Sequence, residues 1–435
     1  MTGNTAHPFQ PGSAGWSRLW ILIVVTGFAA LCFLLFGGRG SADLSAIWLA
    51  GGQISAGRPD LVYPPDTAVF TMLPPPEWTE TARAEGMQGD VFPYVYPPLW
   101  AALAAMLRPV TDLQAVLAAA AVLNPVMLAL SLLMAHRIAA PRLSPPAWMA
   151  AGLVFMIVTS IGLIALGQNQ PQILVSFLIL LAIERSERRA DIAAGIALAL
   201  AAAIKGYPAL IVLVWLMSGN CRAAVAFAAA GGALAALSVA LAGWPLHGDF
   251  LRASRAIAGT GLLTNLSYNL DSVLGNTVLA DRVAFILSPY RDPALGDRAG
   301  WFLYARPGWL VLLGLLLQIA ALALTARALR GRVASGQRAA IWAAGLTFAT
   351  LAGPVAWSYY YIAPAAFLPL LIDRLGWLRG LLAMTVLALP VSAPTAIWFR
   401  QVPFLEDRIE LFGAAVAVAM GIAFLRLSRP RPAPG

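Results

Sequence analysis

Cysteine and charge are both scarce in this chain, and each scarcity excludes a class of protein. Charged residues make up 11% of the sequence, whereas a soluble protein of this size carries about a quarter. Cys32 and Cys221 lie in or beside apolar runs far apart in the chain, which excludes a disulfide framework and a cysteine metal site. The basic residues are dispersed between apolar runs rather than clustered, so nucleic acid is not an expected partner.

Several chemical motifs are missing as well. The sequence has no glycine-rich phosphate loop, no Ser/His/Asp arrangement and no histidine with a second ligand at metal-binding spacing. We therefore predict no metal site and no cofactor. The alternation of apolar residues that a membrane barrel of strands would need is also absent.

Apolar residues are abundant: they form 60% of the chain and give a mean hydropathy of +0.76. Runs of membrane-helix length recur throughout, which predicts an all-α integral membrane protein, a bundle of about 12 transmembrane helices. The predicted spans are residues 20–36, 113–136, 147–166, 171–183, 190–204, 207–217, 222–244, 308–328, 338–352, 359–372, 380–398 and 411–427. The apolar piece 97–108 is short, and we expect it to be re-entrant or interfacial.

The arginines indicate which side of the membrane each loop occupies. With both termini inside, the inner loops carry 16 arginines and 4 acids, and the outer loops carry 12 arginines, one lysine and 16 acids. Positive residues are retained on the cytoplasmic side, so this assignment is self-consistent. It places the unusual polar residues on the outer face, which predicts a multi-pass protein of the bacterial inner (plasma) membrane with a periplasmic active face.

We expect residues 1–435 to form a single polytopic membrane domain. Its outer loops are 37–112, with interfacial helices, and 245–307, and a disordered cytoplasmic tail is expected at about 428–435. The run 20–36 has no small-residue cleavage site after it, so we expect a retained first span rather than a signal peptide.

Asp43 opens a short amphipathic helix directly after the first span, with Leu44, Ile47, Trp48 and Ile54 on one side. An acid in this place is commonly an N-cap or first-turn residue. The same carboxylate, oriented at a membrane surface, suits a general base for an acceptor hydroxyl, and the two interpretations are compatible. The other acids of this loop are interpreted as solvated charge.

Two further polar motifs interrupt the apolar runs. Gln168 and Asn169 belong to a run of side-chain amides that suit lipid poorly. The run is either a hairpin tip in water or, as we favour, an edge that binds hydroxyls or a sugar. Lys205, the only lysine, lies at the edge of a span just before the helix breaker Pro208. It is either a snorkelling lysine that reaches water or a ligand for a phosphate or pyrophosphate oxygen.

The loop 245–307 contains Arg252 and Arg255, which are three residues apart and would share one face of a helix. They are either a solvated helix face or phosphate clamps. Asn265 and Ser267 follow in the same loop and are candidate substrate contacts.

Aromatic residues mark the outer face at three places. Tyr63 closes the segment that begins at Asp43, and Tyr96 belongs to a turn rich in tyrosine and proline. A tyrosine at such a turn is more often an interfacial anchor than a ligand contact, and both interpretations stay open. Trp357, Tyr359 and Tyr360 form the third group, and all five aromatic residues are candidate substrate contacts.

In this order, the motifs resemble those of the polytopic membrane glycosyltransferases of family 87 (the DUF2029 group). The resemblance covers roughly residues 20–375 and is carried by Asp43 with Gly57 and Tyr63 downstream, Tyr96-Pro97-Pro98, Gly167-Gln168-Asn169, Lys205 followed by Pro208, Asn265-Leu266-Ser267, and Pro354 with Trp357. It implies a GT-C-type multi-span helical bundle, a polyprenyl-phosphate-sugar donor, and chemistry on the outer face with an acid of the first outer loop. Asp43 is the position that matches this acid.

One segment departs from the family pattern. Such proteins usually show a Trp followed by an Asp and one or two His, where this chain has Trp357-Ser358-Tyr359-Tyr360-Tyr361. Tyrosine can hydrogen-bond a phosphate or a sugar, but it cannot supply an imidazolium. More of the phosphate binding then falls to Lys205 or the loop arginines, and an altered donor and a loss of activity are both open.

We therefore expect a membrane glycosyltransferase that moves a hexose, of the mannose type, from a polyprenyl-phosphate-linked sugar to a hydroxyl of a lipid or glycan acceptor. Asp43 would be the base, and Lys205, Arg252 and Arg255 would bind the donor phosphate. One alternative is a transporter or flippase of a lipid-linked glycan or a small anion, although transporters place charge at the midplane of repeated halves, and Lys205 lies near a span end. A ligase or acyltransferase that uses the same cleft is a third possibility.

Overall fold

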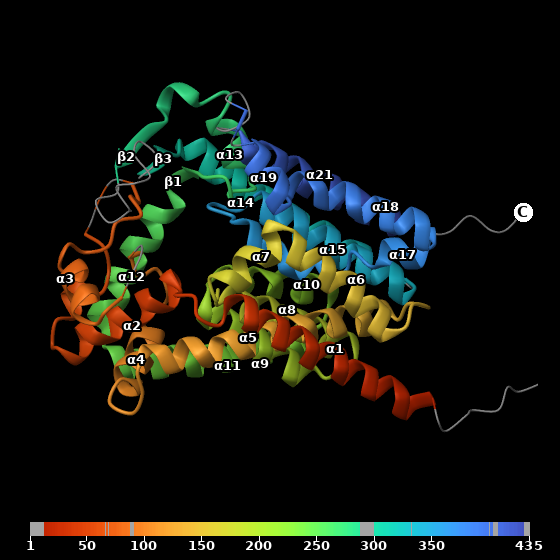
Figure 1. The fold of residues 1–435 in the computed structure, drawn as a ribbon, viewed down its shortest axis with the longest axis horizontal. Helices are drawn as coiled ribbons and strands as arrows, with labels where there is room; N and C mark the ends of the chain where they lie inside the picture. Colours follow the sequence, from red (N-terminus) through yellow and green to blue (C-terminus); the bar gives the residue numbers. More distant parts are fainter. Residues whose placement is uncertain are drawn as a thin grey trace, which may run out of the picture.

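The computed structural model describes residues 13–65, 67, 69–87, 91–287, 300–331, 333–399, 401–402 and 408–429. These residues form an elongated helical bundle (Figure 1). The α-helices are α1 (Ser13–Phe36), α2 (Ala42–Ser55), α3 (Glu77–Ala84), α4 (Pro98–Leu107), α5 (Leu113–Ala139), α6 (Pro145–Val158), α7 (Ser160–Gly167), α8 (Gln172–Glu187), α9 (Asp191–Ile204), α10 (Val212–Ser218), α11 (Cys221–Ala242), α12 (Trp244–Ala258), α13 (Leu270–Gly275), α14 (Gly308–Leu329), α15 (Ser335–Leu351), α16 (Ile362–Ala365), α17 (Leu370–Leu375), α18 (Trp377–Ala388), α19 (Ala393–Phe399) and α21 (Ile409–Leu427). The strands are β1 (Thr260–Leu263), β2 (Ala284–Leu287) and β3 (Gly300–Ala305), and the 3-10 turns are η1 (Pro59–Leu61), η2 (Tyr207–Ile211), η3 (Ala280–Arg282), η5 (Ser358–Tyr361) and η6 (Leu389–Val391).

Five helices of the described chain are long and apolar enough to cross a membrane: α1 from Arg18 onward, α5, α11, α14 and α21. The other predicted spans coincide with shorter or interrupted helices. The span 147–166, for example, is divided between α6 and α7 at Thr159, whose backbone is extended. The chain is therefore a helical membrane bundle, but a count of twelve full-length spans is not confirmed.

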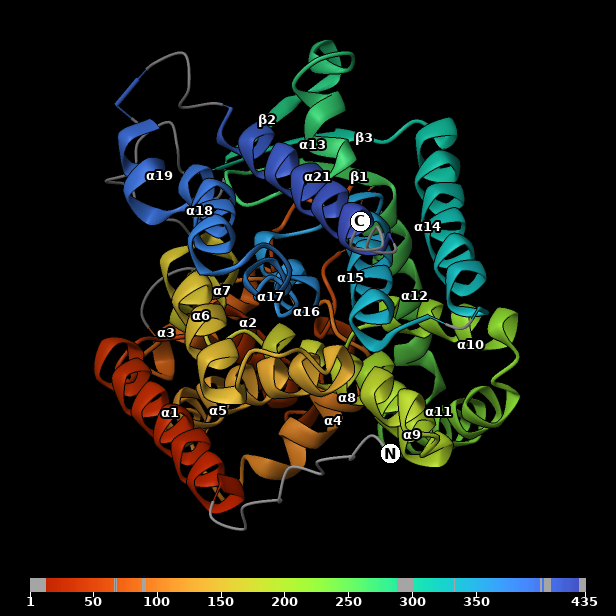
Figure 2. The same ribbon diagram turned by 90° about the vertical axis from the view of Figure 1, so that its right-hand side faces the viewer.

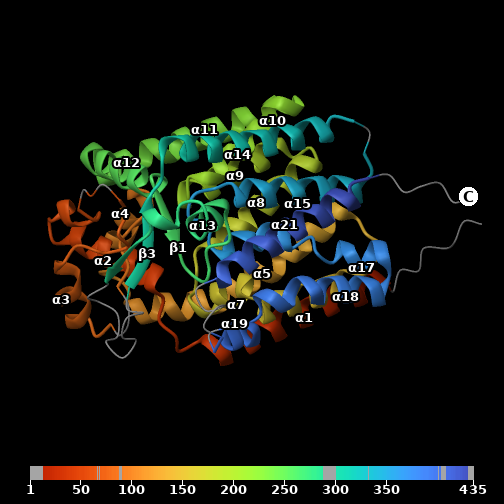
Figure 3. The same ribbon diagram turned by 90° about the horizontal axis from the view of Figure 1, so that it is seen from above.

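The two predicted outer loops meet at one end of the bundle. Figures 1 and 3 show α2, α3, α4, α12 and the strands together at the left end, whereas α17 and the end of α21 lie at the right. Figure 2 looks along the bundle and shows α1 and α14 at opposite edges, where both keep most of their side chains exposed. Segments from 37–112 and from 245–307 thus build one outer layer.

This outer layer contains a three-stranded antiparallel sheet, so the all-α prediction is wrong for the loop 245–307. The strand order is β1-β3-β2, with Thr260 opposite Ala305 and Ala284 opposite Leu303. Apolar runs of four to six residues cannot be assigned to strand or helix by periodicity alone. Residues 288–299 of this loop lie outside the described residues, as do residues 430–435 of the predicted tail.

A buried ion pair joins the sheet to the helices beside it. Arg306 Nε donates to Asp271 Oδ1 at 3.0 Å, and Arg306 Nη1 donates to the Ala258 carbonyl at 2.6 Å. The Tyr304 hydroxyl also donates to the Asp271 carbonyl, at 3.0 Å. Because loss of one partner would leave the other charge buried and unpaired, this pair fixes β3, α12 and α13 relative to one another.

The helix that carries Asp43 is fixed in two ways. Gly51 of α2 lies so close to Ala104 of α4 that a side chain at this glycine would overlap the α4 backbone. Ser41 is the N-cap of α2, since its hydroxyl accepts from the Leu44 amide at 3.1 Å. Asp43 is therefore a first-turn acid rather than the N-cap, and its side chain is free for other partners.

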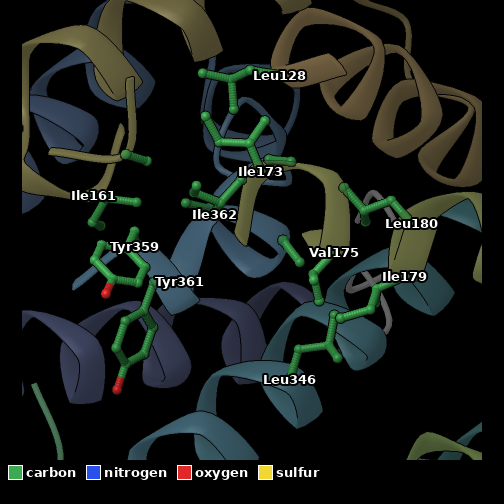
Figure 4. Packing of buried hydrophobic residues seen from close by; sticks show 14 of the residues in the cluster. Leu128, Ile161, Ile173, Val175, Ile179, Leu180, Leu346, Tyr359, Tyr361 and Ile362 are labelled. Atoms are coloured by element: carbon green, nitrogen blue, oxygen red, sulfur yellow. The ribbon is translucent and has the colours of Figure 1, made fainter. Parts of the chain in front are cut away.

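The apolar core reaches into the aromatic segment near the outer end. Tyr359 and Tyr361 belong to the same packed cluster as Ile173 and Ile362 (Figure 4). The Tyr361 hydroxyl donates to the Tyr268 carbonyl at 2.5 Å. The turn η5 is thus held by the core, and its candidate side chains start from a fixed backbone.

Candidate functional site

Asp43 is held by two side-chain donors from other parts of the chain. The Tyr96 hydroxyl donates to Asp43 Oδ1 at 2.6 Å, and Gln170 Nε2 donates to Asp43 Oδ2. The side chain is partly buried at the first turn of α2. Both donors and the helix N-terminus supply partners for negative charge, so the carboxylate has a defined orientation.

Lys205 lies among three tyrosines and forms no ion pair with any described residue. Its Nζ donates to the Tyr360 hydroxyl at 3.4 Å and lies 4.7, 5.5 and 5.7 Å from the ring centres of Tyr360, Tyr359 and Tyr96. Such distances allow cation–π attraction. Burial lowers the pKa of Lys205 to about 8, although the nearby Asp43 carboxylate opposes this shift.

Tyr96 connects the two charged groups. Its hydroxyl bonds Asp43 and its ring faces Lys205, while its own carbonyl accepts from the Tyr63 hydroxyl at 2.7 Å. Burial, followed by the Asp43 carboxylate, raises the pKa of Tyr96 well above its ordinary value, so the phenol keeps its proton and donates it. Tyr63 and Tyr96 both use their hydroxyls within the protein, and their predicted contact with substrate stays a prediction.

The run of amides lies beside Asp43, and its most important member was missing from the predicted site. Gln170, which bonds Asp43, also donates to Gln168 Oε1 at 3.1 Å. Asn169 Oδ1 accepts from Asn124 Nδ2 at 3.3 Å. Asn169 and Gln170 are almost fully buried, so for these two residues the interpretation as a hairpin tip in water is wrong. The signal for Gln170 was its place in the same run.

The aromatic segment after α15 completes the surroundings of Lys205. Trp357 stacks on Tyr359 with ring centres 6.1 Å apart. Tyr207 meets Tyr360 edge to face at 5.3 Å, and Gln172 Nε2 donates to the Tyr207 hydroxyl at 2.6 Å. Tyr207 and Gln172 were not predicted as site residues, although Tyr207 is two residues from Lys205.

Asn265 and Ser267 lie in a turn that supports this segment. Ser267 is fully buried and forms a backbone bridge with Trp357, and the carbonyl of Leu266 accepts from the Ser358 amide at 2.7 Å. The Ser267 hydroxyl bonds that of Thr264 at 3.1 Å. The contacts of Ser267 are thus structural, and the predicted contact of either residue with substrate stays a prediction.

Arg252 and Arg255 share helix α12, as predicted, and both are exposed. Arg252 forms an ion pair with Asp249, so part of its charge is already neutralised. It lines a cleft of about 370 Å³ whose wall also contains Asp60 and Tyr63. Within the described residues, no hydrogen bond or ion pair links either arginine to Asp43 or Lys205, and their role as phosphate clamps stays a prediction.

The prediction that the other acids of the first outer loop are solvated is wrong for Glu85. Glu85 pairs with Arg108 at 2.6 Å and accepts from Trp48 Nε1 at 3.0 Å, so it links the loop to α2 and α4. Asp66 and Asp90 lie outside the described residues. The described part of the chain has no group of three His, Cys, Asp or Glu side chains that could hold a metal ion.

The model of glycosyltransferase family 87 matches residues 94–354, a range that contains Tyr96, Gln170 and Lys205 but neither Asp43 nor Tyr359. No curated protein matches the chain. Among solved structures, the crystal structure of ArnT from Cupriavidus metallidurans bound to undecaprenyl phosphate is similar with 14% identity and a TM-score of 0.38, over 96% of this chain and 77% of that chain.

The family match confirms the resemblance seen in the sequence, and with the apolar helices it makes the protein an integral membrane glycosyltransferase. Because the matched residues 94–354 are more than half of the chain, this protein belongs to glycosyltransferase family 87.

Proposed function

We propose that the protein transfers a sugar of the mannose type from a polyprenyl-phosphate-linked donor to a hydroxyl of a lipid or glycan acceptor. The reaction would take place at the periplasmic face of a bacterial inner membrane. The donor type rests on the family pattern, and the face rests on the arginine distribution and on the outer layer that surrounds Asp43 and Lys205. The fold of this proposed enzyme is a GT-C-type bundle.

One observation carries the proposal: a carboxylate and an ammonium lie on the same tyrosine without pairing with each other. Tyr96 bonds Asp43 through its hydroxyl and faces Lys205 through its ring. Among the ion pairs of the described residues, none includes Asp43 or Lys205. Each group therefore keeps its charge for a substrate. A displacement reaction needs this arrangement, with a base for the attacking hydroxyl and a cation for the leaving group.

The mechanism follows from these two charges. Asp43 accepts the proton of the acceptor hydroxyl, and the oxygen attacks the anomeric carbon of the donor sugar. The bond from that carbon to the phosphate oxygen breaks, and the polyprenyl phosphate leaves with the electron pair. Lys205 meets the charge that develops on this phosphate, a contribution that grows in the transition state. A single displacement of this kind inverts the anomeric carbon.

The tyrosines that replace the family histidine fit this assignment. Tyr359 and Tyr360 lie against Lys205, so they fix the ammonium in place of supplying a second cation. A cation held by aromatic rings is less hydrated than a free one, which strengthens its contact with a phosphate. We assign the donor phosphate first to Lys205 and only then to Arg252 and Arg255.

The test uses purified protein in nanodiscs with a panel of radiolabelled polyprenyl-phosphate sugars and a membrane lipid extract. Wild type is compared with Asp43→Asn, and Glu80→Gln serves as the matched control because Glu80 is an exposed acid of the same outer layer. We expect label to move to a new acceptor in wild type and control, and to fall by about 10²–10⁴-fold in Asp43→Asn.

Full transfer by Asp43→Asn would remove the base assignment. Movement of the donor across the bilayer, with its sugar–phosphate bond intact in every variant, would instead indicate the transporter or flippase.

A further inference from the structure

Gln170 occupies a position that the proposed reaction does not yet use. Its Nε2 lies between two acceptors, Asp43 Oδ2 and, at 3.1 Å, Gln168 Oε1. The residue is 1% exposed. A buried amide that donates to a carboxylate restricts the directions in which that carboxylate can turn.

The orientation of this amide is fixed by its neighbours. If the Gln170 amide were reversed, its carbonyl oxygen would face the oxygens of Asp43 and Gln168, neither of which can donate in that form. The nitrogen therefore faces Asp43. The other end of the amide, Oε1, is buried without a partner among the described residues.

The backbone around Gln170 is equally constrained. The backbone N–H of Gln170 donates to the carbonyl of Ala165, near the end of α7, at 2.9 Å. Asn169 has a left-handed backbone with φ of 48°. Pro171 follows and precedes α8. The side chain of Gln170 thus projects from a tight connection between two helices, which is a rigid support.

We propose that Gln170 is a positioning residue for the base. Tyr96 and Gln170 each donate a hydrogen bond to one carboxylate oxygen of Asp43, so that the remaining lone pairs of the carboxylate face the acceptor hydroxyl. This inference rests on the proposed function and adds the requirement that Asp43 is oriented from two sides. Tyr96 fixes Oδ1 from the turn before α4, and Gln170 fixes Oδ2 from the connection between α7 and α8.

A purely structural role predicts a different behaviour for the same residue. A leucine of similar shape removes the unpartnered Oε1, but it also removes the two hydrogen bonds that Nε2 donates, so some loss of stability is expected for either role. The two roles differ in activity per folded molecule: a structural residue would keep it, whereas a positioning residue would lose it.

The experiment compares Gln170→Leu and Gln170→Glu with wild type in nanodiscs. Gln318→Leu is the control, since Gln318 donates to the Ala349 carbonyl in another part of the bundle. For Gln170→Leu we expect kcat per folded molecule to fall roughly 10- to 100-fold, as for a lost hydrogen bond to a charged group, with the donor KM unchanged. Wild-type kcat in Gln170→Leu overturns the proposal.

Gln170→Glu keeps the size and polarity of the side chain and decides the matter if Gln170→Leu does not fold. It places a second carboxylate beside Asp43, so the acid limb of the pH–rate profile should move to higher pH by about one unit or more. An unchanged profile contradicts the proposal.

A direct readout separates this inference from the proposed function. Infrared difference spectra of aspartate-labelled protein, with Asp43→Asn as the blank, follow the protonation of Asp43 whether or not any sugar is transferred. We expect the Asp43 carboxylate to titrate at higher pH in Gln170→Glu than in wild type. If wild type transfers no sugar but this shift is present, the contact is confirmed and the proposed reaction is wrong; if the shift is absent, the positioning role is wrong.

Discussion

At the end of the bundle that is predicted to be cytoplasmic, here called the inner end, Glu184 and Glu187 pair with arginines, whereas at the opposite, outer end Asp43 and Lys205 are bound by uncharged side chains. Glu184 pairs with Arg185 at 2.5 Å and with Arg188 at 2.7 Å. Glu187 accepts from Arg338 at 2.7 and 2.9 Å. Asp43 instead accepts from a tyrosine and a glutamine, and Lys205 lies against tyrosine rings.

This difference separates architecture from chemistry. A paired charge has its partner inside the protein and can hold helices together, but it has little left for a ligand. A charge held only by neutral groups keeps most of its field for a substrate, which is typical of functional sites. Glu187 connects α8 to α15 through Arg338, and in the proposed mechanism Asp43 and Lys205 act on the bound substrate.

After Asp43→Asn, the largest effect should come from removing the cation. Lys205→Met keeps the length of the side chain but removes the charge proposed to meet the leaving phosphate. We expect kcat/KM for the donor to fall by about 10²–10³-fold, the usual loss for one group that stabilises developing negative charge. Steady-state kinetics with a titrated donor measures this, and a change below about twofold would contradict the assignment.

The shared tyrosine allows the two functions to be separated. Tyr96→Phe removes the hydroxyl that donates to Asp43 but keeps the ring beneath Lys205, so kcat should fall roughly 10- to 100-fold while the donor KM stays the same. Tyr96→Leu removes both and should also raise the donor KM. Tyr304→Phe is the control, since its hydroxyl bonds the Asp271 carbonyl outside the site. Equal kinetic constants for the two Tyr96 variants would show that the Tyr96 ring does not contribute to donor binding by Lys205.

The pH dependence should report Lys205 directly. With a pKa of about 8, Lys205 is protonated below this pH and loses its charge above it. Donor binding is therefore expected to be complete near neutral pH and to weaken about tenfold for each pH unit well above 8. Lys205→Arg stays charged over this range, so its alkaline limb should disappear. An alkaline limb that persists in this variant would belong to another group.

The smallest effect on activity is expected at the inner end. Glu187→Gln weakens a bidentate contact to Arg338, whose side chain is 28% exposed. Since the pair is partly screened by water, we expect a loss of about 1–2 kcal/mol in stability with unchanged activity per folded molecule. Thermal unfolding in detergent and transfer assays on the same sample measure both, and lost activity in fully folded protein would break the comparison.

Much of the bundle could be predicted from the sequence because apolar length and arginine placement are local signals. The apolar helix before Asp43 and the position of Asp43 in the first turn of α2 both follow from such signals. The sheet could not be predicted in this way. The segment β3 is an apolar run of six residues, and only its pairing with β1 and β2 makes it a strand.

The site shows the same limit. Lys205 stands out as the only lysine, but its tyrosine surroundings come from segments more than 100 residues away in the sequence. Gln170 was not predicted as a site residue, because its contact with Asp43 joins two segments that are far apart in the sequence. The ion pair of Arg252 could have been anticipated, because Asp249 lies three residues before it in the sequence, the spacing at which a helix brings an acid and an arginine together.

The most direct test places Asp43→Asn and Glu187→Gln side by side in nanodiscs and measures sugar transfer and thermal stability for both. If the outer end performs the chemistry, Asp43→Asn loses transfer by about 10²–10⁴-fold with its melting temperature preserved, while Glu187→Gln loses stability and keeps its transfer rate. Transfer that survives in Asp43→Asn but is lost in fully folded Glu187→Gln would place the reaction at the inner end and contradict the proposed function.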